Sequence, residues 1–433
     1  MSPTPGQSPM TEKSVIQQSD RVAHFTQDVW SLFTRLTLEN NAVNLGQGFM
    51  NFPAPEFIKQ AAAVTVNDDP CNQYSVPKGR LRLRQALSAT YSPLFGRTLD
   101  PENEVVVTAG ANEGIFATLA GYLDQGSEVI IFEPYFDQYL PNITMNGGVP
   151  VYCPLRIDSH VDRNGVVPSS AWRVDLDELR SKITPRTKII LLNTPHNPVG
   201  KVFSEQELRD IGRIAKENNL LIISDEVYDR LVFKPDVHTR IGALNEFWDR
   251  TITVGSAGKT FGITGWRIGW LMGPQQLLAP ALAAHTRIVF CVNSPLQEAV
   301  AIGFEEADKN GFYERQVAEY ERRREKLTRA IKQAGLPYTA PAGSYFVLVD
   351  TSKIRIPAGF KFPPEIASRG ANFEMCYFLC KEIGVTAIPV SEFYSPENAE
   401  LARDFVRLAF CKTDDLLDEA ARRLQKVTKY IQQ

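Results

Sequence analysis

The chain has few of the residues that build disulfide frameworks or zinc sites. Its 433 residues include six cysteines and five histidines. No cysteines form a C-x-x-C pair, and the histidines are not spaced as zinc ligands are. Scattered cysteines in so long a chain are typical of a reducing compartment and argue against a disulfide framework. We therefore expect no metal site.

Long apolar runs and an excess of one charge are also missing. No apolar segment approaches the roughly 20 residues that cross a bilayer, so no membrane partner is expected. With 47 basic and 50 acidic residues the net charge is −3, which gives no reason to expect nucleic acid as a partner. Residues 1–20 lack arginine and an apolar core, unlike a mitochondrial presequence or a signal peptide. We expect a disordered arm over residues 1–20 and a cytoplasmic protein, with a mitochondrial location left open.

What the sequence does contain is a series of short apolar runs that alternate with helical patterns. Runs that are apolar at consecutive positions are typical of strands buried on both faces of a parallel sheet. They cover Val105–Thr108, Glu128–Phe132, Lys188–Asn193, Leu220–Ser224 and Thr251–Gly255. Such alternation predicts an open α/β sheet that binds ligands beyond the carboxyl ends of its strands. Ser204, followed by Glu207, predicts a helix start with a capping box.

The pattern changes near residue 311. A long charged helix is predicted over Tyr313–Gln333, followed by strands over Ser344–Val349, Val385–Val390 and Arg403–Phe410 and by a terminal amphipathic helix. We predict a large domain over residues 65–312 and a smaller α+β domain over residues 313–433. The N-terminal segment, residues 21–64, is expected to join the smaller domain.

One lysine has an unusual setting. Lys259 lies among small residues, three positions after Ser256 and eight before Arg267. A partly desolvated lysine can act as the nucleophile of Schiff-base chemistry, and a hydroxyl and a guanidinium can bind a phosphate. Together they indicate pyridoxal phosphate (PLP). Taken alone, the segment would more often be a loop with a solvated lysine, but other segments decide against that reading.

Polar side chains follow two other predicted strands. Asp225 can hold the protonated pyridine nitrogen that PLP chemistry requires, or it can be a helix N-cap. Tyr228 and Asn197 can both meet the phenolic oxygen of the cofactor, although Asn-Pro pairs are also common in loops. His196 is expected to be a structural hydrogen-bonding residue rather than a catalyst.

Two further segments suit the same cofactor. The stretch Gly110-Ala111-Asn112 opens a predicted helix after a strand, so its backbone N–H groups can cradle a phosphate. Glycine-rich helix starts are nevertheless common. Phe136 can stack on a flat heteroaromatic ring, and core packing is the alternative.

Taken in this order, the segments resemble the class I aminotransferases, PLP enzymes of the aspartate aminotransferase fold, from about Val29 to the C-terminus. Within that family the chain is most similar to the group of kynurenine aminotransferases (in particular the fungal ones), glutamine transaminase K and cysteine-S-conjugate β-lyase. The intervals from Asn197 to Asp225 and from Asp225 to Lys259, 28 and 34 residues, add to the resemblance. Its segments are Val43–Phe49, Asn72–Ser75, Thr108–Gly114, Phe132–Tyr139, Asn193–Phe203, Ser224–Tyr228, Gly255–Phe261 and Ala387–Tyr394.

The resemblance implies PLP-dependent transferase fold type I, in which a mostly parallel seven-stranded sheet lies between helices beside a smaller α+β domain. It makes Lys259 the Schiff-base lysine and the base that moves the proton. It places Asp225 at the pyridine nitrogen, Asn197 and Tyr228 at the phenolic oxygen, and Phe136 on the ring. The groups it assigns to the phosphate are Ser256, Arg267, the amides of Ala111 and Asn112, and Tyr74 from a neighbouring subunit. A homodimer with shared active sites follows.

For the substrate, the resemblance assigns Arg407 to the α-carboxylate, where a planar guanidinium suits bidentate recognition. Asn197 and the backbone of Gly46 contact the substrate as well. Trp30 and Phe290, the latter from the partner, line the side-chain pocket. Three features depart from the family pattern and leave the substrate preference open: Asn112 in place of a tyrosine, Cys291 in place of a histidine, and an elaborated loop over residues 352–372.

The resemblance thus implies an aminotransferase that moves the α-amino group of L-kynurenine, or of related aromatic or sulfur amino acids, to a 2-oxo acid, giving kynurenate after cyclisation. Alternatives are another specificity (alanine, glutamine with phenylpyruvate, or aromatic amino acids) and a cysteine-S-conjugate β-lyase. A PLP-sensing regulator would need a DNA-binding module, for which the 20-residue arm has no room. No second arginine stands out for a side-chain carboxylate, so the acceptor stays open.

Overall fold

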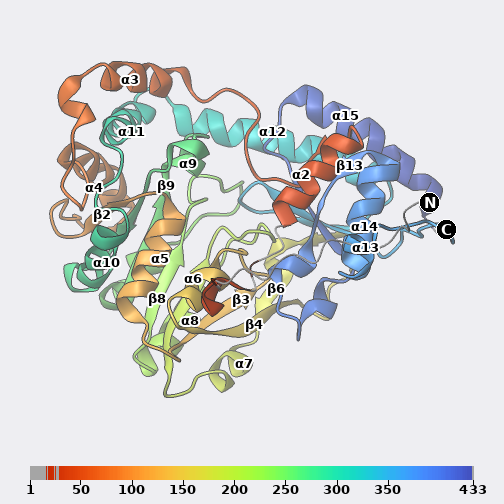
Figure 1. The fold of residues 1–433 in the computed structure, drawn as a ribbon, viewed down its shortest axis with the longest axis horizontal. Helices are drawn as coiled ribbons and strands as arrows, with labels where there is room; N and C mark the ends of the chain where they lie inside the picture. Colours follow the sequence, from red (N-terminus) through yellow and green to blue (C-terminus); the bar gives the residue numbers. More distant parts are fainter. Residues whose placement is uncertain (1–15, 17, 24, 26–28, 432–433) are drawn as a thin grey trace, which may run out of the picture.

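The computed structural model describes residues 16, 18–23, 25 and 29–431. Figure 1 shows a large sheet flanked by helices, with a second group of elements gathered on the right around the helices α2 (Val29–Glu39), α14 (Ala371–Phe378) and α15 (Asp414–Leu424). The arm predicted over residues 1–20 lies almost wholly outside the described residues. Within the described part of the chain, no helix is both long and apolar enough to span a bilayer.

The large sheet has eight strands in the order β2-β10-β9-β8-β7-β3-β4-β6. Neighbours from β9 to β4 run parallel, while β10 is antiparallel to both of its neighbours. The strands are β2 (Val105–Thr108), β3 (Glu128–Glu133), β4 (Val149–Ile157), β6 (Trp172–Val174), β7 (Thr187–Asn193), β8 (Leu221–Asp225), β9 (Thr251–Ser256) and β10 (Gly269–Met272).

The mostly parallel sheet is as predicted, but it has one strand more than the seven expected. The additional strand is β6, which pairs antiparallel with Leu155–Ile157. These are the last residues of β4, beyond Pro154, where β4 leaves its pairing with β3. An edge strand of three residues is too short for its hydrophobic pattern to be recognised in the sequence.

Helices cover both faces of this sheet, because its strands are apolar on both sides. In β7, Ile189 and Leu191 pack into the cluster that contains α5, whereas Ile190 and Leu192 pack into the cluster that contains α8. Ser204 caps α8 through the predicted capping box with Glu207. The helices around the sheet are α3 (Glu56–Val66), α4 (Leu81–Phe95), α5 (Ala111–Tyr122), α6 (Tyr139–Met145), α7 (Leu176–Ser181), α8 (Glu205–Glu217), α10 (Gln275–Ile288) and α11 (Ser294–Ala307).

A second sheet carries the C-terminal part of the chain. Its order is β14-β15-β12-β11-β5, and a separate pair joins β1 to β13. The strands are β1 (Val43–Asn44), β5 (Val166–Pro168), β11 (Tyr338–Ala340), β12 (Phe346–Asp350), β13 (Val385–Thr386), β14 (Ile388–Pro389) and β15 (Phe405–Ala409). The helices here are α12 (Phe312–Gln333) and α13 (Pro364–Ala367), in addition to α2, α14 and α15. The N-terminal helix α1 (Asp20–Ala23) is a single turn.

Two predicted strands differ in this region. The run expected over Val385–Val390 is split, because β13 pairs with β1 and β14 then pairs with β15. The strand expected from Ser344 begins at Phe346, since Ser344 has a left-handed φ of 60° that no strand accommodates. The strand β5 lies in the part of the chain predicted to form the large domain, but it pairs with β11 in the second sheet. The predicted domain boundary at residue 312 stays a prediction.

Candidate active site

A cavity of about 600 Å³ opens at the carboxyl ends of β7, β8 and β9, where an open α/β sheet binds its ligands. Every residue predicted to contact the cofactor from within one chain lines this cavity. These residues are Ala111, Asn112, Phe136, Asn197, Asp225, Tyr228, Ser256, Lys259 and Arg267. The fold therefore brings together groups that lie up to 156 residues apart in the sequence.

Lys259 projects into the cavity from the single helical turn α9 (Ala257–Thr260), which follows β9 directly. Its Nζ donates a hydrogen bond of 2.9 Å to the hydroxyl of Tyr345. Burial lowers the pKa of Lys259 to about 8, and among the described residues no carboxylate lies within ion-pair distance of it. The neutral form of this amine is therefore a minor form at pH 7, but it is far more populated than in a solvated loop lysine.

Asp225 is the last residue of β8 and is 5% exposed. The hydroxyl of Tyr139 donates a short hydrogen bond to Oδ2, and the N–H of Val227 donates one to Oδ1 at 3.3 Å. Burial raises the pKa of this carboxyl to about 6. Residues 226–230 form no helix, so the helix N-cap alternative is wrong. A buried carboxyl facing a cavity suits a protonated ring nitrogen.

The turn after β7 is fixed by Asn193. Its Oδ1 accepts the N–H of Asn197 at 2.7 Å, and its Nδ2 donates to the carbonyl oxygen of Asp225 at 2.9 Å. The side chain of Asn197 then accepts a hydrogen bond of 3.0 Å from Nη1 of Arg407. Asn197 lines the cavity, and its side-chain nitrogen makes no hydrogen bond within the described chain, so it can donate to an oxygen of a bound group.

The end of the cavity formed by α5 suits an anion. The first N–H groups of a helix have no intrahelical acceptor, and the N-cap of α5 is Gly110, which has no side chain to satisfy them. The guanidinium of Arg267 lies directly against this glycine, so that a Cβ placed there would collide with it. Helix amides, a guanidinium and the nearby Ser256 together form a site with the chemistry of a phosphate site.

A second cavity of about 710 Å³ shares Phe136, Asn197, Tyr228 and Lys259 with the first. It extends to the side chains of Trp30 and Phe346, to residues 47–49, and to Arg407. The rings of Trp30 and Phe346 therefore make this side of the second cavity aromatic. The indole nitrogen of Trp30 donates a hydrogen bond of 2.9 Å to Asp137, which fixes the plane of that ring.

Arg407 is 1% exposed, and burial lowers its pKa to about 10, so it is still charged at neutral pH. Besides its bond to Asn197, its Nη2 donates to the carbonyl oxygen of Gly46 at 2.8 Å. The guanidinium lies 4.2 Å from the ring centre of Phe346. Its Nε is buried and has no partner within the described chain. A buried cation without a counter-ion in a cavity is suited to a carboxylate ligand.

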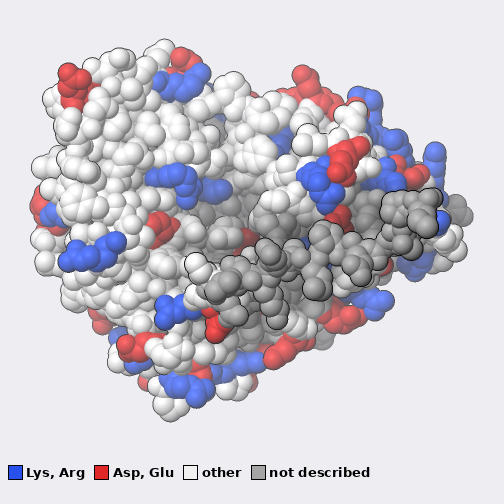
Figure 2. Space-filling model, viewed as in Figure 1, with Lys and Arg blue, Asp and Glu red and all other residues white. Residues whose placement is uncertain are grey.

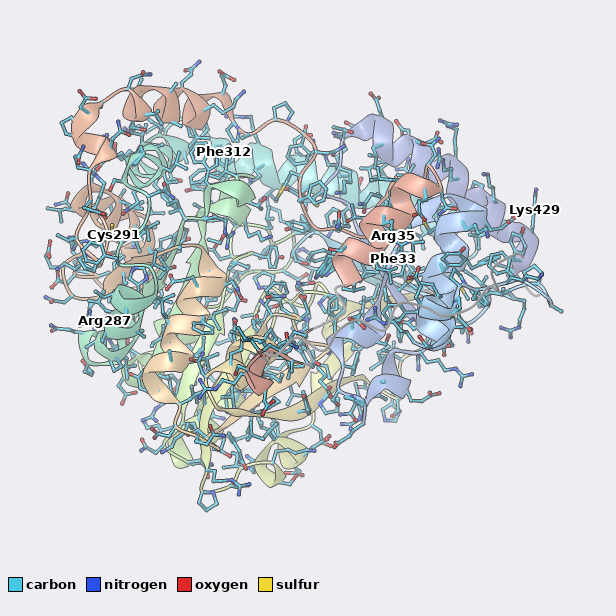
Figure 3. All side chains as sticks on the ribbon, viewed as in Figure 1. Phe33, Arg35, Arg287, Cys291, Phe312 and Lys429 are labelled. Carbon is cyan, nitrogen blue, oxygen red and sulfur yellow. The ribbon has the colours of Figure 1, made fainter. Side chains whose placement is uncertain are left out.

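Three of the predicted site residues line neither cavity: Gly46, whose carbonyl oxygen instead accepts from Arg407, and the pair Tyr74 and Phe290. Tyr74 and Phe290 are 86% and 52% exposed, and their rings pack edge-to-face with centres 5.4 Å apart. Figure 3 shows Cys291, which follows Phe290, near the left-hand edge of the molecule. By contrast, Asn112 lines the first cavity, and its Oδ1 accepts a hydrogen bond of 2.9 Å from Asn142. The roles predicted for Tyr74 and Phe290 require a partner subunit and stay predictions.

The sequence did not assign three residues that hold the predicted ones in place. Tyr139 and Asn193 belong to motifs that carry the resemblance, so their position after a strand was a usable signal. Tyr345 contacts Lys259 across 86 residues of chain, and no local pattern indicates such a contact. Long-range pairs of this kind depend on how the two sheets meet.

The family model for aminotransferase class I and II matches residues 40–424. The chain belongs to this family. It is 44% identical over 415 residues to the Saccharomyces cerevisiae protein named "Probable kynurenine–oxoglutarate transaminase BNA3", covering 93% of both chains. It is 39% identical over 419 residues to kynurenine–oxoglutarate transaminase of Dictyostelium discoideum, covering 95% of this chain and 96% of that one.

A solved structure agrees with the family assignment. The crystal structure of Bna3p from Saccharomyces cerevisiae matches this aminotransferase with a TM-score of 0.93 and 42% identity, covering 97% of this chain and 100% of the other. Enzymes of this family and fold depend on PLP and use amino acid and 2-oxo acid substrates.

Proposed function

We propose that this aminotransferase uses PLP to move the α-amino group of L-kynurenine, and of related aromatic or sulfur amino acids, to a 2-oxo acid. The keto acid formed from kynurenine then cyclises to kynurenate. The observation that carries the proposal is the position of Lys259, which lines both cavities, between the anion site near Arg267 and the carboxylate site at Arg407. The names of the yeast and Dictyostelium relatives support kynurenine as the donor.

The residues of the first cavity fit PLP. Asp225 would hold the ring nitrogen, Asn197 and Tyr228 the phenolic oxygen, and Phe136 one face of the ring. The phosphate would lie at Ser256, Arg267 and the first amides of α5. When bound, PLP supplies an aldehyde that takes up the amino group and a pyridinium ring that accepts electrons from the α-carbon.

The chain itself supplies a base and an orienting cation. In its neutral form, the amine of Lys259 accepts a proton at Nζ and returns it, and the lowered pKa keeps that form populated. Arg407 binds the α-carboxylate of the amino acid and so orients the α-carbon toward Lys259. Tyr139 holds the Asp225 carboxyl through its hydroxyl. The aromatic walls formed by Trp30 and Phe346 suit an aromatic side chain.

A homodimer is part of the proposal. Tyr74 and Phe290 form an exposed aromatic pair on the outside of the chain, and exposed aromatic clusters are typical of interfaces. In the proposed dimer, Tyr74 reaches the partner's phosphate and Phe290 its side-chain pocket. Figure 2 shows acidic and basic side chains interspersed on the face it views.

The test is product formation by the purified, PLP-loaded protein. L-Kynurenine is supplied with a panel of 2-oxo acids, and kynurenate is measured by chromatography. Kynurenate that forms only when both substrates are present is the expected result. Pyruvate release from a cysteine S-conjugate without any 2-oxo acid would indicate β-lyase activity instead. Turnover of alanine or glutamine with none of kynurenine would reject the proposed donor. The cytoplasmic location stays a prediction for cell fractionation to test.

A further inference from the structure

The amine of Lys259 is held by a tyrosine that does not belong to the proposed cofactor contacts. Its Nζ lies 2.9 Å from the hydroxyl oxygen of Tyr345. The same hydroxyl lies 2.7 Å from the carbonyl oxygen of Gly48. Tyr345 therefore joins the reactive lysine to residues 47–49, which line the substrate cavity.

The directions of these two hydrogen bonds are fixed. A carbonyl oxygen can only accept, so the single proton of the Tyr345 hydroxyl is donated to Gly48. The hydroxyl oxygen is then an acceptor toward Lys259, which must be the donor. Burial also raises the pKa of Tyr345, so the phenol remains neutral. Lys259 thus faces an oriented neutral acceptor, which holds the amine without the full charge stabilisation that a carboxylate would give to the ammonium form.

The ring of Tyr345 has little freedom to move. It is 0% exposed, stacks on Tyr320 with centres 6.1 Å apart, and packs edge-to-face on Tyr228 at 5.1 Å. A Cβ on Gly48 would be 3.0 Å from its ring and 2.5 Å from that of Phe346, so the loop also packs closely here. The preceding Ser344 has a left-handed φ of 60°. Such a conformation is uncommon in a residue other than glycine and clusters at functional sites.

We propose that Tyr345 is a positioning residue for catalysis, which holds the free amine of Lys259 in reach of the substrate cavity and links it to the loop at Gly48. The inference deepens the proposed function and rests on the assignment of Lys259 as the proton-moving base. A tyrosine that served packing alone would need its ring but not its hydroxyl. The hydroxyl is thus the group to remove.

Two matched variants separate these roles. Tyr345→Phe removes the hydroxyl and keeps the stacked ring. Tyr320→Phe removes the hydroxyl of the neighbouring ring, which is buried and has no partner among the described residues. The titratable and charged groups that face Lys259, namely Asp225, Tyr228, Arg267, Arg407 and Cys411, are the same in both variants.

The first readout needs neither cofactor nor substrate. Cofactor-free protein is labelled with a trace of acetic anhydride across a pH series, and the labelling of the Lys259 peptide is measured by mass spectrometry. Loss of an acceptor destabilises the ammonium form more than the neutral amine. The pH at which Lys259 labelling is half-maximal should therefore be about one unit lower in Tyr345→Phe than in the wild type. In Tyr320→Phe it should equal the wild-type value. In the loaded enzyme, Tyr345→Phe should lower kcat about tenfold with little change in KM.

Identical labelling midpoints and kcat values in the two variants would overturn the proposal. If Tyr345→Phe does not fold, neutron diffraction on wild-type crystals decides instead, since a Tyr345 proton directed at Lys259 rather than at Gly48 would also overturn it. Failure of the wild-type protein to turn over kynurenine would reject the proposed substrate but would leave the labelling comparison intact. The two proposals can therefore fail separately.

Discussion

Nη1 of Arg407 donates a hydrogen bond of 3.0 Å to Oδ1 of Asn197, and this bond joins the two cavities of the site. Both side chains are buried. Arg407 is proposed to bind the substrate carboxylate, and Asn197 is proposed to bind the phenolic oxygen of the cofactor. A change in the position of either side chain is therefore transmitted directly to the other.

Arg407→Lys should lower kcat/KM for the amino donor by about 10–100-fold. The guanidinium donates to both Asn197 and Gly46 and still offers groups to a carboxylate, whereas an ammonium cannot reproduce this planar arrangement. The measurement is steady-state kinetics with kynurenine. Arg35→Lys is the control and should behave as wild type, since Arg35 lies on α2 (Figure 3) and its side chain is exposed. Wild-type kcat/KM in Arg407→Lys would contradict the carboxylate assignment.

Lys259→Ala should fold and bind PLP but lose turnover by at least about a thousandfold, because it lacks the amine that moves the proton. Circular dichroism and cofactor absorbance check the first two points, and kynurenate formation checks the third. Efficient transamination by this variant would show that another group is the base.

Asp225→Asn should stabilise the cofactor-free protein at pH 8 while weakening PLP binding. Burial raises the pKa of Asp225 from 3.8 to about 6, so between these values the folded chain holds a proton that the unfolded chain releases. Folding stability therefore falls as the pH rises from about 4 to about 6 and stays lowered above that. Removing this charge should raise the free energy of unfolding of the cofactor-free protein by about 1–2 kcal/mol at pH 8, allowing for the weakened hydrogen bond from Val227.

Urea denaturation of the cofactor-free proteins at pH 8 and pH 4 measures this effect. The free energy of unfolding of Asp225→Asn should exceed that of the wild type at pH 8, and this difference should shrink toward pH 4. Asp177→Asn, at an exposed position, is the control. A wild-type protein that is the more stable one at pH 8 would show that the carboxylate is satisfied without the cofactor.

Hybrid dimers should restore activity if Tyr74 serves the partner's site. A heterodimer of Lys259→Ala and Tyr74→Ala chains has one site with both defects and one site with neither. Refolding an equal mixture should therefore give about a quarter of the wild-type activity, since half of the dimers are hybrids with one intact site. A mixture no more active than the sum of its two components would place Tyr74 in the site of its own chain.

The parts of this molecule that could be predicted are those that local sequence determines. The strands β3, β7 and β8 are apolar on both faces, and each ends in the motif that supplies a site residue. By contrast, the hydroxyl of Tyr345 reaches Lys259 only because two sheets meet, and the split of residues 385–390 depends on pairing with β1. Partners distant in sequence decide both features, and hydrophobic periodicity carries no information about them.

The most direct test of the central claim is a half-reaction. PLP-loaded protein is mixed with L-kynurenine in the absence of any 2-oxo acid, and the absorbance of the bound cofactor is followed. The proposed function predicts that the lysine-bound form converts fully to the pyridoxamine form, with one equivalent of product per chain. An unchanged spectrum with kynurenine, together with conversion by alanine, glutamine or a cysteine conjugate, would contradict kynurenine as the amino donor.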